Sequence, residues 1–287
     1  MHVHSVHSGM STLPVLGRFC RESYSPPEAV YETLHRRGMG LVTLTDHDSI
    51  DGAERLRSRA DFFVSEEVTC TAPSGTELHV GVYGITERHH RELQRRRNDL
   101  PRLSAYVCEQ CLFASVNHPF SALTGARHPE DFEWFSVFPG IEVLNAHLAR
   151  DNNLLARRFA EWSGQISLGG SDAHTVASAG SAWTEVPGAR NRDEFLAGLR
   201  CGRGRVLGKA GTYVKMTCDV FRVAAAVIAD KPWCAALAPL LVAVPVMTLG
   251  NFAAERVFAQ EWARLVRDDA GQIAFDARPQ PQEKFVA

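Results

Sequence analysis

Short apolar runs alternate with stretches of helical periodicity through most of the chain. The short runs, bounded by polar residues or glycine, predict strands at 41–45, 62–68, 77–83, 112–116, 140–144, 165–168 and 205–207. Residues 8–27 have the Ser, Gly and Pro content of a loop. Apolar positions three or four residues apart predict a helix capped by Ser25 and ended by Gly38, and further helices or helical turns at 51–59, 87–97, 102–110, 131–135, 152–162 and 191–200.

Strands that alternate with helices predict an α/β fold with mostly parallel strands. At least six such units precede residue 210. That number fits a closed barrel better than a short open sheet, so we expect a barrel with its active face at the carboxyl ends of the strands.

The pattern changes after residue 216. The segment 220–229 is strongly apolar, and 232–254 carries no charged residue but is interrupted by prolines. A pair of helices packed on the barrel or on another subunit, a peripheral membrane contact, and a true membrane span all fit this segment. We therefore predict a catalytic domain at 1–215, an apolar helical extension at 216–266 and a polar, disordered tail at 267–287.

Composition and charge narrow the class of protein. Apolar residues make up 45% of the 287 residues and charged residues 22%, which is typical of a folded globular chain. The net charge of −2 and the lack of a basic stripe argue against a nucleic-acid partner. Seven cysteines, an odd number, and an N-terminus without a secretory pattern favour a reducing compartment, so we expect a cytoplasmic protein, with membrane association through 216–266 as the alternative.

Histidines and carboxylates gather where the predicted strands end. Each of seven strand ends supplies at least one of them, and the set comprises His2, His4, Asp46, His47, Asp48, Glu66, Glu67, His79, His118, Glu142, Asp172 and His174. Burying so many ionisable groups together is costly unless a cation neutralises them. Imidazole and carboxylate ligands suit Zn²⁺, Mn²⁺ or Fe²⁺, and a set this large indicates two or three ions.

Several of these blocks occur together in one family. The segments HVHS (2–5), TDHDSIDG (45–52), SEEV, LHVGVYG, NHPF and GGSDAHT appear in the order found in the PHP (polymerase and histidinol phosphatase) family of metal-dependent phosphoesterases, which the chain resembles over about residues 1–210. The resemblance implies a distorted (β/α)7 TIM-like barrel that holds two or three divalent metal ions. It also implies metal ligands at His2, His4, His47, Glu67, His79, His118, Asp172 and His174, with Glu67 shared between two ions.

Two departures from the family pattern concern the first loop. Members usually have a strand and an Asp-Leu pair before the first histidine pair, whereas only Met1 precedes His2 here, so either translation starts further upstream or the first strand is clipped. Many members also have an aspartate, a ligand of the third metal, where this chain has Gly9. His7 lies nearby and is a candidate substitute. A clipped first strand would loosen His2 most, whereas the missing aspartate affects the third metal site.

Candidates for the chemistry and for substrate contact follow from position. Asp46 and Asp48 are expected to help protonate the leaving group, as is a histidine of the third site, and Glu142 is expected to contact a metal-bound water. Guanidinium groups suit phosphate, so the candidate substrate-binding residues are Arg18, Arg21 and Arg127. Alternation along the strand sends only one of Glu66 and Glu67 inward, and the motif register selects Glu67.

Clustered divalent ions activate water and clamp phosphate oxygens. We therefore predict an enzyme that hydrolyses a small phosphomonoester, such as a sugar phosphate, a nucleotide or a histidinol-phosphate-like compound, through a metal-bridging hydroxide. An exonuclease or phosphodiesterase acting on nucleic acid is the second hypothesis. The third is a metal-binding regulatory module that has lost catalysis. Peripheral membrane contact or homo-oligomer formation through 216–266 is a further expectation about partners.

Overall fold

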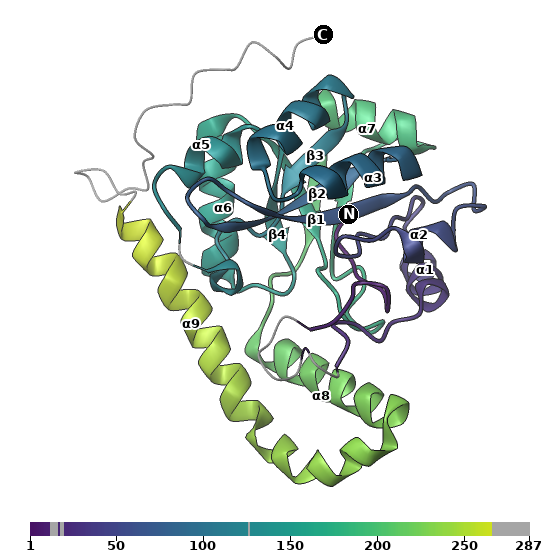
Figure 1. Cartoon of the computed structure of the whole chain (residues 1–287), viewed down its shortest axis with the longest axis vertical. Helices are drawn as coiled ribbons and strands as arrows, with labels where there is room; N and C mark the ends of the chain where they lie inside the picture. Colours follow the sequence, from purple (N-terminus) through teal and green to yellow (C-terminus); the bar gives the residue numbers. More distant parts are fainter. Residues whose placement is uncertain (12–16, 18–19, 126, 266–287) are drawn as a thin grey trace.

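The computed structural model describes residues 1–11, 17, 20–125 and 127–265. Its centre is a five-stranded sheet in the order β1-β2-β3-β4-β5 (Figure 1). These strands are β1 (Ser65–Thr71), β2 (Glu77–Tyr83), β3 (Phe113–Val116), β4 (Gly140–Asn145) and β5 (Ile166–Gly170). The fold is therefore a mixed α/β fold, and the predicted strand at 77–83 has the observed bounds.

The sheet is mixed, which corrects the expectation of mostly parallel strands. β1 pairs antiparallel with β2 and β2 antiparallel with β3, whereas β3, β4 and β5 are parallel. Only residues 72–76 connect β1 to β2. This connection is too short for the crossover helix that parallel strands require, so the two strands run antiparallel. Between β2 and β3 the chain forms two helices, α3 (Glu87–Arg96) and α4 (Leu100–Glu109). This helix pair brings the chain back to the end of the sheet at which β2 stops, so β3 runs antiparallel to β2. His79 consequently reaches the site from the first half of its strand.

Two irregular segments continue the hydrogen bonding beyond β5 and back to β1. The amides of His4 and Asp172 donate to the carbonyls of Ala173 and His2 at 3.1 and 2.9 Å. The segment 42–47 then follows, with Thr45 donating to the Val3 carbonyl at 3.0 Å and Glu67 of β1 donating to the Asp46 carbonyl at 3.1 Å. The predicted strand at 41–45 is thus reduced to one isolated bridge, between Val42 and Phe62.

Helices surround the sheet, and together they enclose the main hydrophobic core. Besides α3 and α4 they are α1 (Pro27–Arg36), α2 (Asp51–Glu54), the 3-10 turn η2 (Ala122–Thr124), α5 (Asp131–Ser136), α6 (Arg150–Ser163) and α7 (Arg192–Arg200). Phe120, Phe135 and Phe159 are almost completely buried and meet edge to face. Edge-to-face packing of this kind adds to the stability from burial, and it fixes the loop that follows β3.

Two local predictions are wrong. Ser25 does not cap α1, because Pro26 occupies the N-cap position and the Ser25 hydroxyl donates to the His174 carbonyl at 3.3 Å instead. A strand was missed at β6 (Ala182–Glu185), which pairs antiparallel with β7 (Arg205–Gly208) in a separate two-stranded sheet. The segment AWTE of β6 is too short and too mixed in polarity to stand out in the sequence.

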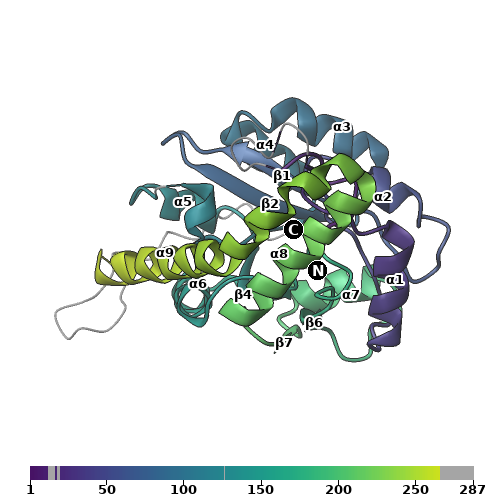
Figure 2. The same ribbon diagram turned by 90° about the horizontal axis from the view of Figure 1, so that it is seen from below.

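The C-terminal extension is helical. It comprises α8 (Tyr213–Asp230), the 3-10 segment η3 (Pro232–Ala243) and α9 (Val244–Leu265). Figure 1 shows α8 across the bottom of the domain, a bend at η3, and α9 returning along the side that carries α6. The view from below confirms that α8 overlies the domain while α9 extends past α6 (Figure 2). The predicted tail at 267–287 lies outside the described residues.

Candidate metal centre

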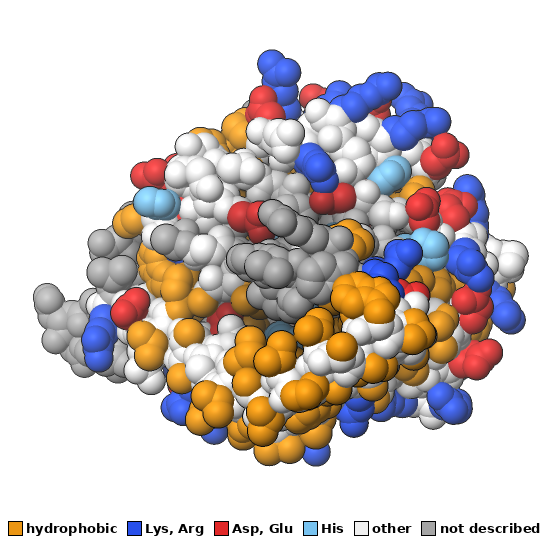
Figure 3. Space-filling view, turned by 60° about the horizontal axis from the view of Figure 1, so that its bottom comes forward, with side chains coloured by type: hydrophobic (Ala, Val, Ile, Leu, Met, Phe, Trp, Pro, Cys, Tyr) orange, Lys and Arg blue, Asp and Glu red, His pale blue; other side chains and the backbone are white. Residues whose placement is uncertain are grey.

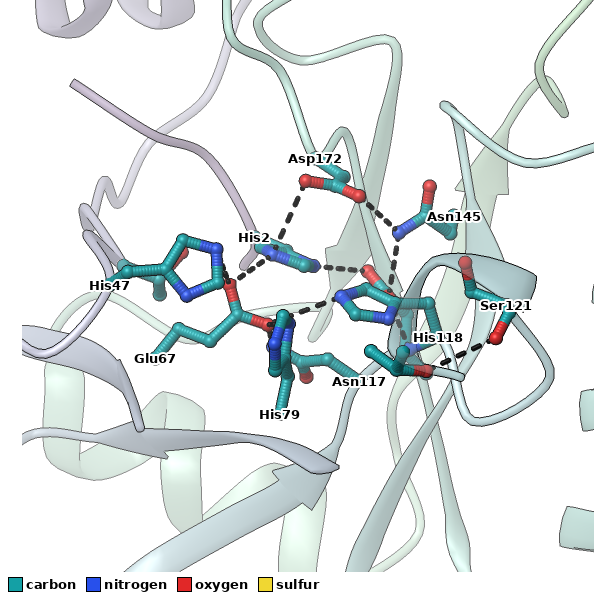
Figure 4. A network of polar contacts seen from close by, with 12 residues as sticks. His2, His47, Glu67, His79, Asn117, His118, Ser121, Asn145 and Asp172 are labelled. Carbon is teal, nitrogen blue, oxygen red and sulfur yellow. Dashed lines mark hydrogen bonds and ion pairs between the residues drawn. The ribbon is translucent and has the colours of Figure 1, made fainter. Parts of the chain in front are cut away.

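Four side chains from distant parts of the sequence, those of His2, His4, Glu67 and Asp172, meet in one cluster. Figure 4 shows His2, Glu67 and Asp172 turned toward one another. The Nε2 atoms of His2 and His4 lie 3.0 Å apart, and each faces a carboxylate oxygen of Glu67, at 2.9 and 3.3 Å. The Oδ1 atom of Asp172 lies 3.5 Å from His2 Nε2 and 3.2 Å from His4 Nε2. His2, His4 and Glu67 are almost completely buried.

The spacing of these atoms fits a divalent ion. Ligands bound at about 2.1 Å in a tetrahedron lie about 3.4 Å apart, which is close to the separations within this group. Imidazole nitrogens and carboxylate oxygens are also the donors that Zn²⁺, Mn²⁺ and Fe²⁺ accept. The donor atoms of His2, His4 and Asp172 all lie within 4.8 Å of one another, as do two other groups of three that include Glu67. The residues present therefore suit a metal site.

The other oxygen of Glu67 faces a second set of side chains. Its Oε1 atom lies 3.3 Å from His118 Nε2 and 3.6 Å from His79 Nδ1, and it accepts a hydrogen bond from Asn117 Nδ2 at 2.9 Å. His79 Nδ1 is buried and has no hydrogen-bond partner among the described residues. A buried imidazole nitrogen without a partner is costly, and a metal ion on this side of Glu67 would satisfy it. Glu67 thus stands between two candidate metal positions.

A third group lies at the edge of the cluster, and it contains a residue that the sequence analysis missed. Glu22 has one carboxylate oxygen 3.4 Å from His174 Nε2 and the other 3.7 Å from His47 Nε2. Its pKa is lowered to about 2, because the neighbouring histidines outweigh the effect of burial. Glu22 comes from the irregular first loop, where no periodicity or motif could have selected it.

Glu142 orients residues of the cluster through hydrogen bonds. It accepts a hydrogen bond from His2 Nδ1 at 3.0 Å, from the His118 amide at 3.0 Å and from Asn145 Nδ2 at 2.9 Å. Asn145 also donates to Asp172 at 3.0 Å. The structure therefore places Glu142 against candidate ligand residues, where it favours the tautomer of His2 whose Nε2 faces the candidate metal position.

Burial and neighbouring carboxylates set the proton affinities in the cluster. Burial alone would lower the pKa of His4, but hydrogen bonds to Asp172 and Glu67 raise it to about 10. The pKa of His2 is likewise raised well above its usual value by Glu67, Glu142 and Asp172 against the effect of burial. Burial dominates at His47 and lowers its pKa to about 3. These groups behave as a coupled set in which cations, either protons or metals, offset the carboxylates.

The backbone at two candidate ligands is strained. His118 and Asp172 have φ angles of 28° and 44°, in the left-handed region that residues with a Cβ rarely adopt. Gly170, two residues before Asp172, packs so closely that a Cβ atom there would collide with His2 and Glu142. Strain of this kind persists where the surroundings hold it, commonly at functional sites.

The candidate acids are placed differently from one another. Asp46 is buried and accepts hydrogen bonds from the Ser5 amide at 2.5 Å, the Ser5 hydroxyl at 2.7 Å and the Ser8 hydroxyl at 3.0 Å. Ser8 in turn bonds His4 Nδ1 at 2.8 Å, so Asp46 acts on the cluster through Ser8. Asp48 instead pairs with Arg97 at 2.5 Å and accepts from the Thr69 amide at 3.0 Å.

Neither of the two candidate arginines that the structure describes, Arg21 and Arg127, makes a hydrogen bond or ion pair with the cluster. Arg127 is buried, and its guanidinium donates to the carbonyls of Pro119 at 2.7 Å and Glu77 at 3.1 Å, so it holds the loop after β3. Arg21 is exposed and donates to the Val6 carbonyl at 3.2 Å. Arg18 lies outside the described residues. Glu66 points toward α3, where it accepts from His90 at 2.7 Å and Gln94 at 3.0 Å.

Residues 150–203 match the family described as PHP-associated, and this match confirms the resemblance to the PHP family. No curated protein matches the chain.

Among solved structures, PsfC from Pseudomonas syringae superposes with a TM-score of 0.55 at 19% identity, covering 78% of this chain and 94% of that one, and it shows the shared fold. A candidate metal-dependent phosphoesterase from Bifidobacterium adolescentis has a TM-score of 0.43 at 11% identity, over 71% of this chain and 97% of its own. An amidohydrolase from Chromobacterium violaceum, solved with sulfate and no metal, has a TM-score of 0.41 at 14% identity, over 67% and 89%. The family match and the buried cluster together support a metal-dependent hydrolase in general terms.

Proposed function

We propose that the chain is a metal-dependent phosphoesterase that hydrolyses a small phosphomonoester. The observation that carries this proposal is the position of Glu67, whose two oxygens face two different sets of histidines, with Asp172 completing the first set. Two or three divalent ions bound there would activate water and neutralise the charge that develops on a phosphate. Candidate ligands are His2, His4, Glu67 and Asp172 for the first ion, and Glu67, His79 and His118 for the second.

The third site is proposed to use His47, His174 and Glu22. Glu22 supplies the carboxylate that the family pattern has at the position of Gly9, because it contacts both histidines from the same first loop. His7 has a different setting, with its ring beside Gly52. The chain would thus keep the chemistry of the third site with a ligand from a different position in the loop.

Proton delivery to the leaving group is assigned to the partly exposed edge of the cluster, which we call the rim and which contains His174 and Glu22. Asp46 accepts hydrogen bonds from two serines, and Asp48 contacts Arg97 and the Thr69 amide. Neither carboxylate is therefore free to reach the leaving group. His174 has 22% of its side chain exposed and Glu22 18%. When no third ion is bound, His174, held by the Glu22 carboxylate at this open rim, is suited to give a proton to a departing alkoxide.

The fold proposed for this function is the distorted (β/α)7 barrel. The hydrogen bonds of 2–4 and 42–47 support it, because they connect β5 back to β1 through two strand-like segments. The division into a catalytic domain at 1–215 and an extension at 216–266, and a cytoplasmic location, belong to the same proposal. A small substrate is favoured over nucleic acid, because the candidate ligands are buried and the net charge is −2.

The test is metal analysis of the purified protein with a phosphate-release screen over monoesters, diesters and short oligonucleotides. Turnover of monoesters that depends on added Mn²⁺ or Zn²⁺ supports the proposal. Cleavage of oligonucleotides alone would establish the nuclease instead. Bound metal without turnover of any ester would establish a regulatory module that has lost catalysis.

A further inference from the structure

The bend between α8 and the middle of α9 exposes an uncharged surface, which we call the apolar elbow (residues 232–254). No charged residue occurs in this segment. Its aliphatic side chains are open to solvent, with exposed fractions of 84% at Val242, 74% at Val246 and 67% at Leu240. Trp233, at the start of the elbow, is 61% exposed.

Figure 3 shows these side chains gathered in a continuous band along the extension, while charged side chains lie mainly on other parts of the same face. A contiguous apolar surface of this kind marks an interaction site rather than ordinary solvent-exposed surface. An 18-residue window within Pro232–Arg264 also has a mean hydropathy of 1.9, and the segment is long and apolar enough to cross a membrane by length and composition alone.

The composition of the elbow fits lipid better than protein. Protein interfaces concentrate Trp, Tyr, Phe, Met and Arg among their buried contacts and have a polar rim. Of these residues the elbow has no Tyr and no Arg, and its exposed side chains are Ala, Leu, Val, Met and Pro with one Trp. Tryptophan prefers the headgroup level of a bilayer, and aliphatic side chains prefer the hydrocarbon below it. Lys231 stands directly before the elbow, where its ammonium could approach a lipid phosphate, whereas Arg256, shortly after the elbow, pairs with Asp151 of α6 at 3.1 Å.

Both ends of the elbow are held on the same side, which excludes a span in this arrangement. On α8, Asp219 is buried and accepts hydrogen bonds from Thr175 at 2.9 Å and Ser178 at 2.6 Å. On α9, Glu255 is 1% exposed and accepts from Ser121 and from the Ala122 amide, each at 3.0 Å. A chain anchored to one domain on both sides of an apolar bend can dip into a bilayer but cannot leave through the opposite face.

The same anchors lie next to candidate metal ligands. Thr175 follows His174, and Ser121 lies three residues after His118. Cys20, which lies two residues before Glu22, makes a third contact by packing with Val227 and Cys234 of the extension. The extension therefore touches each of the three loops that carry these rim and cluster residues.

We propose that the apolar elbow inserts into one leaflet of a lipid bilayer and docks the protein at the membrane surface. The docking does not depend on the proposed hydrolysis, since its determinants are the exposed side chains of η3 and the first half of α9. It places the loops after His118 and His174 beside the lipid headgroups, because those loops are bonded to the ends of the extension.

Vesicle flotation of the full chain tests this docking without measuring activity. Vesicles of phosphatidylcholine, with and without phosphatidylglycerol, are mixed with wild-type protein, with the double variant Leu240→Glu, Val242→Glu, and with Leu154→Glu as a matched control. Leu154 is 47% exposed but lies on α6, outside the extension. We expect wild type and control to float with vesicles. The affinity of the double variant for vesicles should be lower by at least about tenfold.

Quenching of tryptophan fluorescence by brominated lipid supplies a second measurement, which needs no charged substitution in the elbow. We expect quenching in wild type and its loss in Trp233→Phe. Three results would overturn the proposal: wild type that binds neither kind of vesicle, a soluble dimer that the two glutamates dissociate, or protein that alkaline carbonate cannot release from membranes. The second result would establish an interface between copies, and the third a membrane span.

Discussion

Glu142 accepts a hydrogen bond from Nδ1 of His2 at 3.0 Å, across 140 positions of sequence. This bond directs the other nitrogen of His2 toward Glu67. Replacing Glu142 with Ala removes the acceptor and frees the imidazole to rotate or change tautomer. Loss of such an outer contact costs about 10–100-fold in metal affinity. We expect that loss in Glu142→Ala by isothermal titration with Zn²⁺, and partial recovery in Glu142→Gln; equal affinity in all three proteins would refute the role of Glu142.

Adjacent glutamates of β1 provide a matched pair. Glu67 faces the histidines, whereas Glu66 bonds His90 and Gln94 of α3. Glu67→Gln should lower bound metal and metal-dependent phosphate release by more than about a hundredfold, since it removes a shared ligand charge. Glu66→Gln should keep both. Metal content is measured by plasma mass spectrometry and activity by phosphate release, and similar losses in the two variants would contradict the assignment.

Glu22 determines whether a third ion binds. In Glu22→Gln the carboxylate between His47 and His174 loses its charge while its shape is kept. We expect the variant to bind one ion fewer than wild type when metal content is measured after dialysis, with the remaining ions retained. The control is His7→Gln, which tests the other candidate in the same loop. A full complement of metal in Glu22→Gln, with a loss in His7→Gln, would reverse the assignment.

Stability of the metal-free protein should fall as the pH rises. The pKa of His4 is about 10 in the folded protein and 6.5 in its reference state, so the proton on His4 stabilises the fold fully below pH 6.5. That stabilisation is lost as the pH rises toward 10, and His2 acts in the same direction. Thermal unfolding in EDTA should show a lower Tm at pH 9.5 than at pH 7, with a smaller decrease once Zn²⁺ is bound. A Tm that rises over this range would contradict the prediction.

Glu255 joins the extension to the loop after β3. Its carboxylate accepts from Ser121, from the Ala122 amide and from Asn152 Nδ2 at 2.9 Å. In Glu255→Gln the new NH₂ group would face these donors, so we expect a loss of about 1–3 kcal/mol in the free energy of unfolding. Urea denaturation measures this loss, with Glu261→Gln, an exposed position of the same helix, as the control. Equal stability of both variants would show that the Glu255 contacts contribute little.

The sequence allowed the cluster to be located because its histidines and carboxylates follow apolar runs in a fixed order. The same apolar runs did not predict in which direction each strand runs or where each side chain points. β2 runs antiparallel because two helices precede β3, and a helix pair looks like two separate units in the sequence. Asp48 and Arg127 follow the same positional rule as the ligands, yet they point to Arg97 and to backbone carbonyls.

Glu22, Asp219 and Glu255 could not be selected from the sequence for another reason. Each acts through contacts with residues more than twenty positions away, and none belongs to a motif or a periodic pattern. Short-range rules describe turns, caps and faces of helices, whereas these carboxylates are recognisable only when the loops they bind have been placed. The long-range contacts of the extension with the rim are therefore the part of the site that required coordinates.

The pairing of residues 2–4 with residues 172–173 has a consequence for how the protein is made. On the ribosome, His2 and His4 are made long before Asp172, so this pairing can form only after residue 172 has been synthesised. The loop that carries His118 completes its contacts later still, because Glu255 lies more than a hundred positions downstream. Contacts between such distant positions form late and slowly. The candidate metal-binding groups are therefore fully assembled only after residue 255 has been translated, and a shorter nascent chain has no complete candidate centre with which to capture metal.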